Sequence, residues 1–291
     1  MDLALVLGAG GLTGIAWHLG LLAGLREQGV DLTGADLIVG TSAGAVAGAL
    51  LAGGLDPVDA ARLEARLTDA DPPMQPDWAR GTEVFGLLND TERDPASVRA
   101  AVGTLALAAD VVAEEPYVIA LGRRLPSHDW PDRPLLITAV DAATGHPVTW
   151  DRTSGVPLDR AVAASCAVPC IFPPVTMNGS RYMDGGVRSL TNADLATGAA
   201  RVVVLSPLSP TRTRARGTTD AELDTLRRDT RDTRDSRDAR ATRATLVVPD
   251  AEALDALGSN VFDATRWDPA FDAARAQGHR VAPAVSAACF A

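Results

Sequence analysis

Lysine is absent from this sequence of 291 residues, and aromatic residues make up only 4% of it. The basic side chains are therefore arginines, apart from four histidines. We attribute the absence of lysine to codon composition and not to function. With so few aromatics, the core must consist mainly of alanine, leucine and valine. The formal net charge of -10 argues against non-specific binding of nucleic acid and against electrostatic attraction to anionic lipid.

Cysteine is also scarce, with Cys166, Cys170 and Cys289 as the three examples. An odd number in a chain of this length argues against a disulfide framework. Cys166 and Cys170 form C-x-x-x-C, but no second ligand pair accompanies them, so we expect no metal site. The start of the chain has no basic leader before its first apolar run, which predicts no signal peptide and a cytoplasmic location.

The segment at 36–48 organises the rest of the chain. It reads as a short apolar strand, a tight turn and a helix, with Ser42 at the turn inside Gly40-Thr41-Ser42-Ala43-Gly44. In a G-x-S-x-G elbow the serine stands on a strained strand-to-helix turn, and the flanking glycines, Gly40 and Gly44, let neighbouring backbone pass closely. An ordinary glycine-rich turn is the alternative, but the strand–elbow–helix context favours a serine nucleophile.

A glycine-rich loop, Gly8-Ala9-Gly10-Gly11-Leu12-Thr13-Gly14, follows the apolar strand at 3–7. It could hold a dinucleotide, but strict G-x-G-x-x-G spacing fails at Thr13, and no acidic residue ends the next strand. It could be a plain turn before the helix at 15–28. With Ser42 after the neighbouring strand, we favour an oxyanion hole made by backbone N–H groups.

The remaining chain alternates strands and helices. We expect helices at 57–67, 95–110, 115–124 and 158–167, strands at 135–140, 148–150, 201–205 and 245–248, a hairpin at 175–183, and helix again from 254, including 267–276. Residues 69–94 read as irregular, with scattered apolar side chains that could admit an acyl chain or pack on the domain. The Arg/Asp repeat within 207–243 predicts a solvated surface helix, with 210–219 as its disordered start.

A serine nucleophile needs a base. The order Ser42, Asp184, His279 matches the Ser–Asp–His order of α/β-hydrolases, although His279 reads as a helix-end residue. The alternative is a Ser–Asp dyad, with Asp184 held by the turn Asp184-Gly185-Gly186 and taking the proton directly. Asp-Gly-Gly is also a common turn without chemistry.

Together these motifs resemble the patatin-like phospholipases. The glycine-rich loop, the serine elbow and Asp184-Gly185-Gly186 stand in that family's order. The runs 164–175 and 184–194 also look like its blocks. The resemblance spans roughly residues 3–205, and the segment 257–278 is similar to bacterial members.

The resemblance implies one three-layer α/β/α domain over 1–291 with a mostly parallel sheet. Residues 69–131 would be a lid or helical insertion, and 207–243 an Arg/Asp-rich surface segment. It implies a Ser42–Asp184 dyad, an oxyanion hole from Gly10, Gly11 and Leu12, no cofactor, and hydrolysis of lipid or acyl esters with transient contact with a membrane surface. His279 would then not be catalytic.

The sequence departs from the family at Thr13, where Arg or Lys is common, which puts phospholipid preference in question. It departs again at Cys170, where glycine is usual.

Two other interpretations stay open. The chain could be a catalytically weak patatin-like module, or a nucleotide-binding domain that uses the N-terminal loop. The oligomeric state and the acyl chain length do not follow from the sequence.

Overall fold

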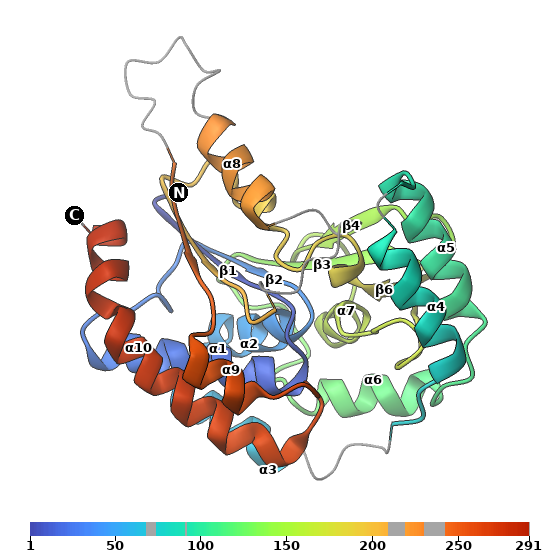
Figure 1. The fold of residues 1–291 in the computed structure, drawn as a ribbon, viewed down its shortest axis with the longest axis horizontal. Helices are drawn as coiled ribbons and strands as arrows, with labels where there is room; N and C mark the ends of the chain where they lie inside the picture. The colour runs from blue at the N-terminus through green and yellow to red at the C-terminus, as the bar shows by residue number, and fades with distance from the viewer. Residues whose placement is uncertain (68–73, 91, 209–218, 230–241, 291) are drawn as a thin grey trace.

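The computed structural model describes residues 1–67, 74–90, 92–208, 219–229 and 242–290. In these residues one sheet has the strand order β5-β6-β3-β2-β1-β7-β8, with β4 paired to β3 (Figure 1). The strands are β1 (Leu3–Leu7), β2 (Leu37–Gly40), β3 (Leu135–Asp141), β4 (Pro147–Trp150), β5 (Val175–Met177), β6 (Ser180–Asp184), β7 (Arg201–Leu205) and β8 (Arg243–Val247).

The sheet is mixed but mostly parallel at its centre. Strands β3, β2, β1, β7 and β8 run parallel, whereas β4 and β6 pair antiparallel with β3, and β5 pairs antiparallel with β6. The central strands are continuous apolar runs, as expected for strands covered on both faces. Residues 4–7 of β1 and all of β2 are buried.

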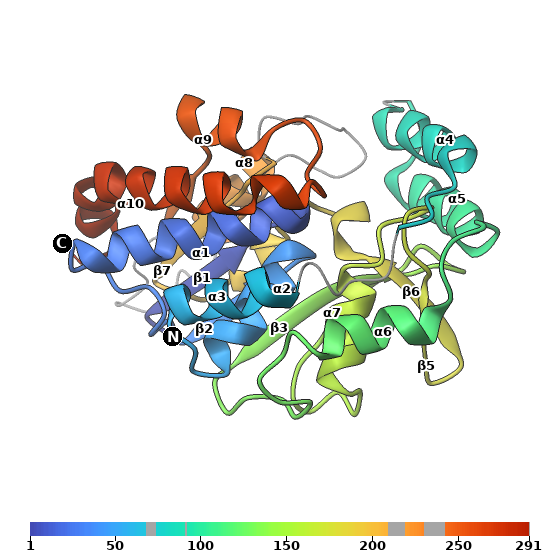
Figure 2. The same cartoon turned by 90° about the horizontal axis from the view of Figure 1, so that it is seen from below.

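Helices cover both faces of the sheet, as the sequence predicted. On one face lie α1 (Gly11–Glu27), α2 (Ala43–Ala52), α3 (Pro57–Leu67), α7 (Leu158–Ser165), α9 (Ala251–Leu257) and α10 (Trp267–Phe290), with α6 (Glu114–Gly122) against α7 (Figure 2). Helices α1 and α10 pack closely, because a Cβ at Gly24 would lie 2.1 Å from the carbonyl oxygen of Arg275.

The opposite face is covered in two places. Helix α8 (Thr219–Asp229) packs Leu223 and Leu226 over β1 and β7. Helices α4 (Trp78–Asn89) and α5 (Pro95–Leu107) pack over the β3–β6 end, where Val140 and Met183 meet them. Because alternate residues of β3 face this side, Thr138 lies on it between the two patches. The layers are therefore helix, sheet and helix.

Two local predictions were wrong. Residues 69–94 were expected to be irregular, but 78–89 form α4. The prolines and glycines there masked a helix that starts after Pro76, where Asp77 caps it by accepting from the Arg80 N–H at 3.2 Å. Helix α1 begins at Gly11, inside the glycine-rich loop, instead of at residue 15. A glycine at φ +62° can join the first turn without strain.

Other local predictions are confirmed. Helix α3 starts at Pro57, α5 starts at Pro95 after the Asp94 cap, and Asn178-Gly179 turns the hairpin. One further boundary was wrong, because α10 runs on to Phe290, past the predicted residue 276. The Arg/Asp repeat falls mainly at 230–241, which lies outside the described residues. The expected disordered start at 210–219 also lies outside them, except for Thr219, where α8 begins. No helix within the described ranges is long and apolar enough to cross a membrane.

Candidate active site

Ser42 sits on a strained turn between β2 and α2. Its backbone has φ 55° and ψ -119°, a conformation that non-glycine residues rarely adopt. A Cβ at Gly44 would lie 1.9 Å from the carbonyl oxygen of Leu7, so this position accepts only glycine. Ser42 is 5% exposed and precedes the first turn of α2, whose positive dipole end it faces. This is the predicted elbow.

The end of α7 fastens the elbow through contacts that motif spacing did not reveal. The Ser42 N–H donates to Ser165 Oγ at 2.9 Å, and the Cys166 thiol donates to the Ser42 carbonyl oxygen at 3.3 Å. Burial, with Asp184 nearby, raises the pKa of Cys166 well above its usual value, so the thiol keeps its proton. The only sequence signal for these residues was the Ala164-Ser165-Cys166 run.

Asp184 ends β6 and begins the Asp-Gly-Gly turn. Its Oδ1 accepts from the Gly186 N–H at 2.6 Å, and its own N–H donates to the Ala167 carbonyl at 3.0 Å. The residue is 4% exposed. A Cβ at Gly185 would lie 2.2 Å from Thr138 Oγ1, so the turn packs directly on β3. The Gly186 N–H thus holds the carboxylate, and the Ala167 carbonyl holds the backbone of Asp184.

The glycine-rich loop leaves backbone donors beside the elbow. Within the described chain, the N–H groups of Gly10, Gly11 and Leu12 donate no hydrogen bond, whereas the next N–H, that of Thr13, donates to the Val261 carbonyl at 3.0 Å. A Cβ at Gly11 would lie 2.6 Å from Val261 Cγ2, so glycine is needed for this close approach. These three N–H groups lie at the N-terminus of α1, a favourable place for an anion.

A small cavity of about 120 Å³ joins the three motifs. Its lining includes Gly10, Gly11, Ser42, Asp184 and Gly186. Residues far apart in the sequence therefore surround one space. An ester carbonyl placed there would have a hydroxyl, a carboxylate and backbone donors around it.

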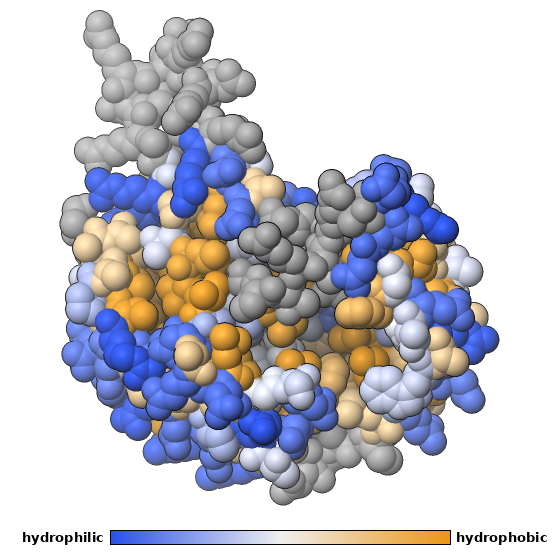
Figure 3. Space-filling model, viewed as in Figure 1, coloured by the Kyte–Doolittle hydropathy of each residue, from blue (hydrophilic) through white to orange (hydrophobic). Residues whose placement is uncertain are grey.

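A larger pocket of about 290 Å³ opens from the other side of the elbow. Ser42, Gly11 and Phe262 are near both cavities. The larger one is lined mainly by apolar side chains from α1, α2 and α6, including Ile15, Val46 and Leu121. Figure 3 shows apolar side chains gathered in the hollow between α9 and α6. Such a pocket suits a hydrocarbon chain.

The remaining sequence candidates lie elsewhere. His279, the third member of the Ser–Asp–His alternative, is on α10 and contacts Glu27 at 2.7 Å on the outer surface. It lines neither cavity, so that alternative is wrong. Thr13, at the position where the family often has a basic residue, is fully buried. It therefore presents no group to a substrate.

The fold and site define an α/β protein with a serine elbow, and comparison with known proteins gives its family. The model of the patatin-like phospholipase family matches residues 5–197, and the chain belongs to that family. The chain is similar to uncharacterized NTE family proteins of Mycobacterium bovis and Mycobacterium tuberculosis, at 32% identity over 186 residues. That match covers 63% of this chain and 42% of each relative, so it spans less than half of their length.

Two solved structures are also similar. VipD from Legionella pneumophila aligns over 97% of this chain and 66% of its own, with 13% identity and a TM-score of 0.44. The type III effector protein ExoU aligns over 97% and 53%, with 18% identity and a TM-score of 0.41. Because both scores are low, the fold assignment rests on the sheet topology and not on these two structures.

Proposed function

We propose that this protein is a serine lipid acyl hydrolase that cleaves carboxylic esters of the phospholipase A type through a Ser42–Asp184 dyad. Family membership supports a lipid hydrolase in general. One observation supports the finer proposal: Ser42, Asp184 and the glycine-rich loop line one cavity. No cofactor is needed for this chemistry, and no observation favours the nucleotide-binding alternative.

The reaction follows from the placement of these groups. Asp184 accepts the proton of Ser42 Oγ as this oxygen attacks the ester carbonyl carbon, and the carbonyl oxygen becomes an oxyanion. The N–H groups of Gly10, Gly11 and Leu12 stabilise that charge, as a preformed oxyanion hole does. Asp184 then gives its proton to the leaving alkoxide, which departs as an alcohol and leaves an acyl-enzyme.

Water completes the cycle. Asp184 takes a proton from the water molecule while the water oxygen attacks the acyl carbon, and the second tetrahedral intermediate uses the same N–H groups. Its collapse breaks the bond to Ser42 Oγ, which recovers its proton from Asp184, and the carboxylic acid leaves. Throughout the cycle the acyl chain occupies the 290 Å³ pocket beside the elbow.

The same proposal includes transient contact with a lipid surface. Trp78 and Phe85 are 70% and 64% exposed and lie seven residues apart, on one side of α4. Met74, 41% exposed, also lines the 290 Å³ pocket. Exposed aromatics on the helix that follows Met74 suit insertion into a lipid surface. The net charge of -10 makes this contact hydrophobic and not electrostatic. A cytoplasmic location stays a prediction.

Hydrolysis of p-nitrophenyl esters from acetate to palmitate tests the dyad. Wild type should turn over, and Ser42→Ala and Asp184→Asn should each lose at least a thousandfold in kcat/KM while keeping the wild-type melting temperature within a few degrees. Wild-type activity that is unchanged in both variants would contradict the proposal. Inactivity of the wild type on esters and on phospholipid vesicles would favour a catalytically weak module.

Co-sedimentation with neutral phosphatidylcholine vesicles tests the surface contact. The variant with both Trp78→Ala and Phe85→Ala should lose binding. Leu254→Ala, which removes an exposed apolar side chain from α9, serves as the control and should bind like wild type. Equal binding by all three proteins would reject this surface.

A further inference from the structure

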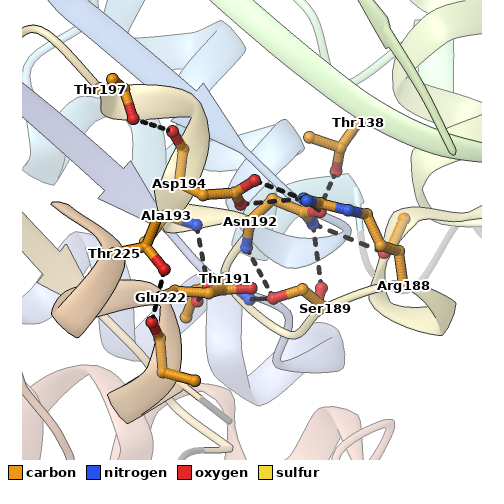
Figure 4. A network of polar contacts seen from close by, with 12 residues as sticks. Thr138, Arg188, Ser189, Thr191, Asn192, Ala193, Asp194, Thr197, Glu222 and Thr225 are labelled. Carbon is orange, nitrogen blue, oxygen red and sulfur yellow. Dashed lines mark hydrogen bonds and ion pairs between the residues drawn. The ribbon is translucent and has the colours of Figure 1, made fainter. Parts of the chain in front are cut away.

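Asn192 lies in the loop that follows the Asp-Gly-Gly turn and is 1% exposed. Its backbone is left-handed, with φ 51° and ψ 37°. Figure 4 shows its side chain at the centre of a polar network, facing Thr138 and the Arg188–Ser189 segment. Neither Asn192 nor Thr138 lines the two cavities beside Ser42, so neither contacts a substrate there.

The two ends of this amide have separate partners. Oδ1 accepts from Arg188 Nη1 at 2.7 Å, which fixes the orientation of the amide. Nδ2 donates to the Ser189 carbonyl at 2.9 Å and to Thr41 Oγ1 at 3.0 Å, with the Gly185 carbonyl at 3.5 Å. Thr41 precedes Ser42, and Gly185 follows Asp184. One buried amide therefore contacts the neighbours of both members of the dyad.

The sheet explains why such a contact is needed. Strands β2 and β6 both pair with β3 and run in opposite directions, so they approach the same level of β3 from its two ends. Gly40 pairs with Ile137 and Asp184 pairs with Ala139. The elbow and the Asp-Gly-Gly turn therefore meet on either side of Thr138. Because no hydrogen-bonded ladder joins β2 directly to β6, their separation is set by their ladders to β3 together with the side chains at this level.

Thr138 contributes to the same link. Its Oγ1 lies 2.9 Å from Thr41 Oγ1 and 3.3 Å from Asn192 Nδ2. It also forms the surface on which Gly185 packs. The three side chains thus form one polar cluster beneath the dyad, in which the two Nδ2 hydrogens of Asn192 are shared among four acceptors.

We infer that Asn192, together with Thr138, is a positioning residue that sets the placement of Ser42 relative to Asp184. The inference rests on the proposed function. A second network holds this loop in place: Arg188 pairs with Asp194, and Glu222 of α8 accepts from Thr191 Oγ1 and from the Ala193 N–H at 3.0 Å. Displacement of a reacting group by about 1 Å can cost about a hundredfold in rate. Loss of this link should lower kcat and leave KM nearly unchanged.

The test uses the isosteric change Asn192→Asp in the full chain. The carboxylate still accepts from Arg188, but it cannot donate to Thr41 or to the two carbonyls. We expect kcat for p-nitrophenyl esters to fall between tenfold and a hundredfold, with KM within about twofold. Asn178→Asp is the matched control, because Asn178 is also left-handed, at φ 52°, but is exposed on the β5–β6 hairpin. It should match wild type.

If Asn192→Asp unfolds below the assay temperature, Thr138→Val and Thr138→Ser provide the test of the positioning role instead. Valine keeps the shape of threonine and removes the hydroxyl, whereas serine keeps it. Positioning predicts a loss of kcat in the valine variant and recovery in the serine variant. Wild-type kcat in Asn192→Asp, or equal kcat in the two Thr138 variants, would overturn the inference.

Covalent labelling with a fluorophosphonate distinguishes failure of the positioning role from failure of the proposed function. Labelling of wild type that is absent in Ser42→Ala shows an activated Ser42, and Asn192→Asp should then label at least tenfold more slowly than Asn178→Asp. Equal labelling rates would overturn the positioning role alone. Wild type with neither labelling nor hydrolysis would overturn the proposed function, and this inference with it.

Discussion

Arg124 and Glu64 form an ion pair inside the protein, at the wall of the pocket that opens beside Ser42. Glu64 belongs to α3 and is fully buried, and Arg124 follows α6 and is 3% exposed. Arg124 lines the pocket among apolar side chains. Two charges removed from water stabilise each other only as a pair. The pocket wall therefore depends on both.

Glu64→Gln should lower the free energy of unfolding by about 3–5 kcal/mol, since it removes the charge of the buried carboxylate that pairs with Arg124. Asp59→Asn on the same helix is the matched control. Asp59 pairs with Arg62 at 3.0 Å, but both side chains are exposed, so this change should cost less than about 1 kcal/mol. Urea unfolding measures both. Similar losses in the two variants would show that the buried Glu64–Arg124 pair contributes no more to stability than the exposed Asp59–Arg62 pair.

Gly44→Ala and Gly14→Ala test how tightly the elbow is packed. A Cβ at Gly44 meets the Leu7 carbonyl oxygen at 1.9 Å, whereas one at Gly14 meets its nearest atom at an ordinary 3.6 Å. Gly44→Ala should therefore prevent folding or lower the melting temperature by more than 10 °C, on the order of 3–5 kcal/mol or more for a chain of this size. Gly14→Ala should be neutral or stabilising by up to about 1 kcal/mol. A stable Gly44→Ala protein would mean that the strand and the helix are not this close.

How much of the site could be predicted from the sequence depends on whether its residues are adjacent in the chain. The serine elbow, the glycine-rich loop and the Asp-Gly-Gly turn are local patterns, and each is recognisable from a few adjacent residues. Asn192, Thr138 and Thr41 are far apart in the chain, and only the sheet order brings them together. No local spacing could reveal that cluster.

Two other features were also not predictable from their neighbours in the sequence. Glu64 occupies one position of an amphipathic helix, and nothing near it in the sequence shows that it is buried against Arg124. Helix α4 was missed because Gly81 and Gly86 were read as helix breakers, yet a Cβ at either would contact almost nothing. These glycines lie on open sides of the helix, where they weaken it without ending it.

His18 should make the stability of this protein depend on pH. Its ring is fully buried, Nε2 lies 2.8 Å from the Gly8 carbonyl oxygen at the start of the glycine-rich loop, and Nδ1 has no partner among the described residues. Burial lowers the pKa of His18 from 6.5 to about 4. Between these values the unfolded chain binds the proton and the folded chain does not. The free energy of unfolding therefore falls as the pH is lowered through this range.

Urea unfolding at pH 7.5 and pH 5.0 measures this effect. The contribution of His18 to the fall should be about 2 kcal/mol, at about 1.4 kcal/mol for each pH unit below 6.5. His18→Gln keeps a donor for the Gly8 carbonyl and cannot be protonated. Its free energy of unfolding should therefore fall by about 2 kcal/mol less than that of wild type between the two pH values. Equal falls in the two proteins would show that His18 is not held neutral by the fold.

Ala120→Leu tests whether the 290 Å³ pocket holds the acyl chain. Ala120 is a buried residue of α6 that lines this pocket. A leucine adds three heavy atoms there, and at roughly 30 Å³ for each, by comparison with a water molecule, it removes about a third of the volume. Activity on p-nitrophenyl palmitate should fall at least tenfold, the optimum should move to shorter chains, and activity on the acetate should stay within about twofold.

The control for this change is Ala287→Leu, an exposed position on α10 outside the pocket lining. It makes the same substitution in a helix and should leave the chain-length profile as in wild type. An equal loss on every ester in Ala120→Leu would mean that the leucine disturbs the elbow and not the acyl chain. An unchanged profile in both variants would place the acyl chain outside this pocket, because a filled site cannot bind a long chain as well as an open one.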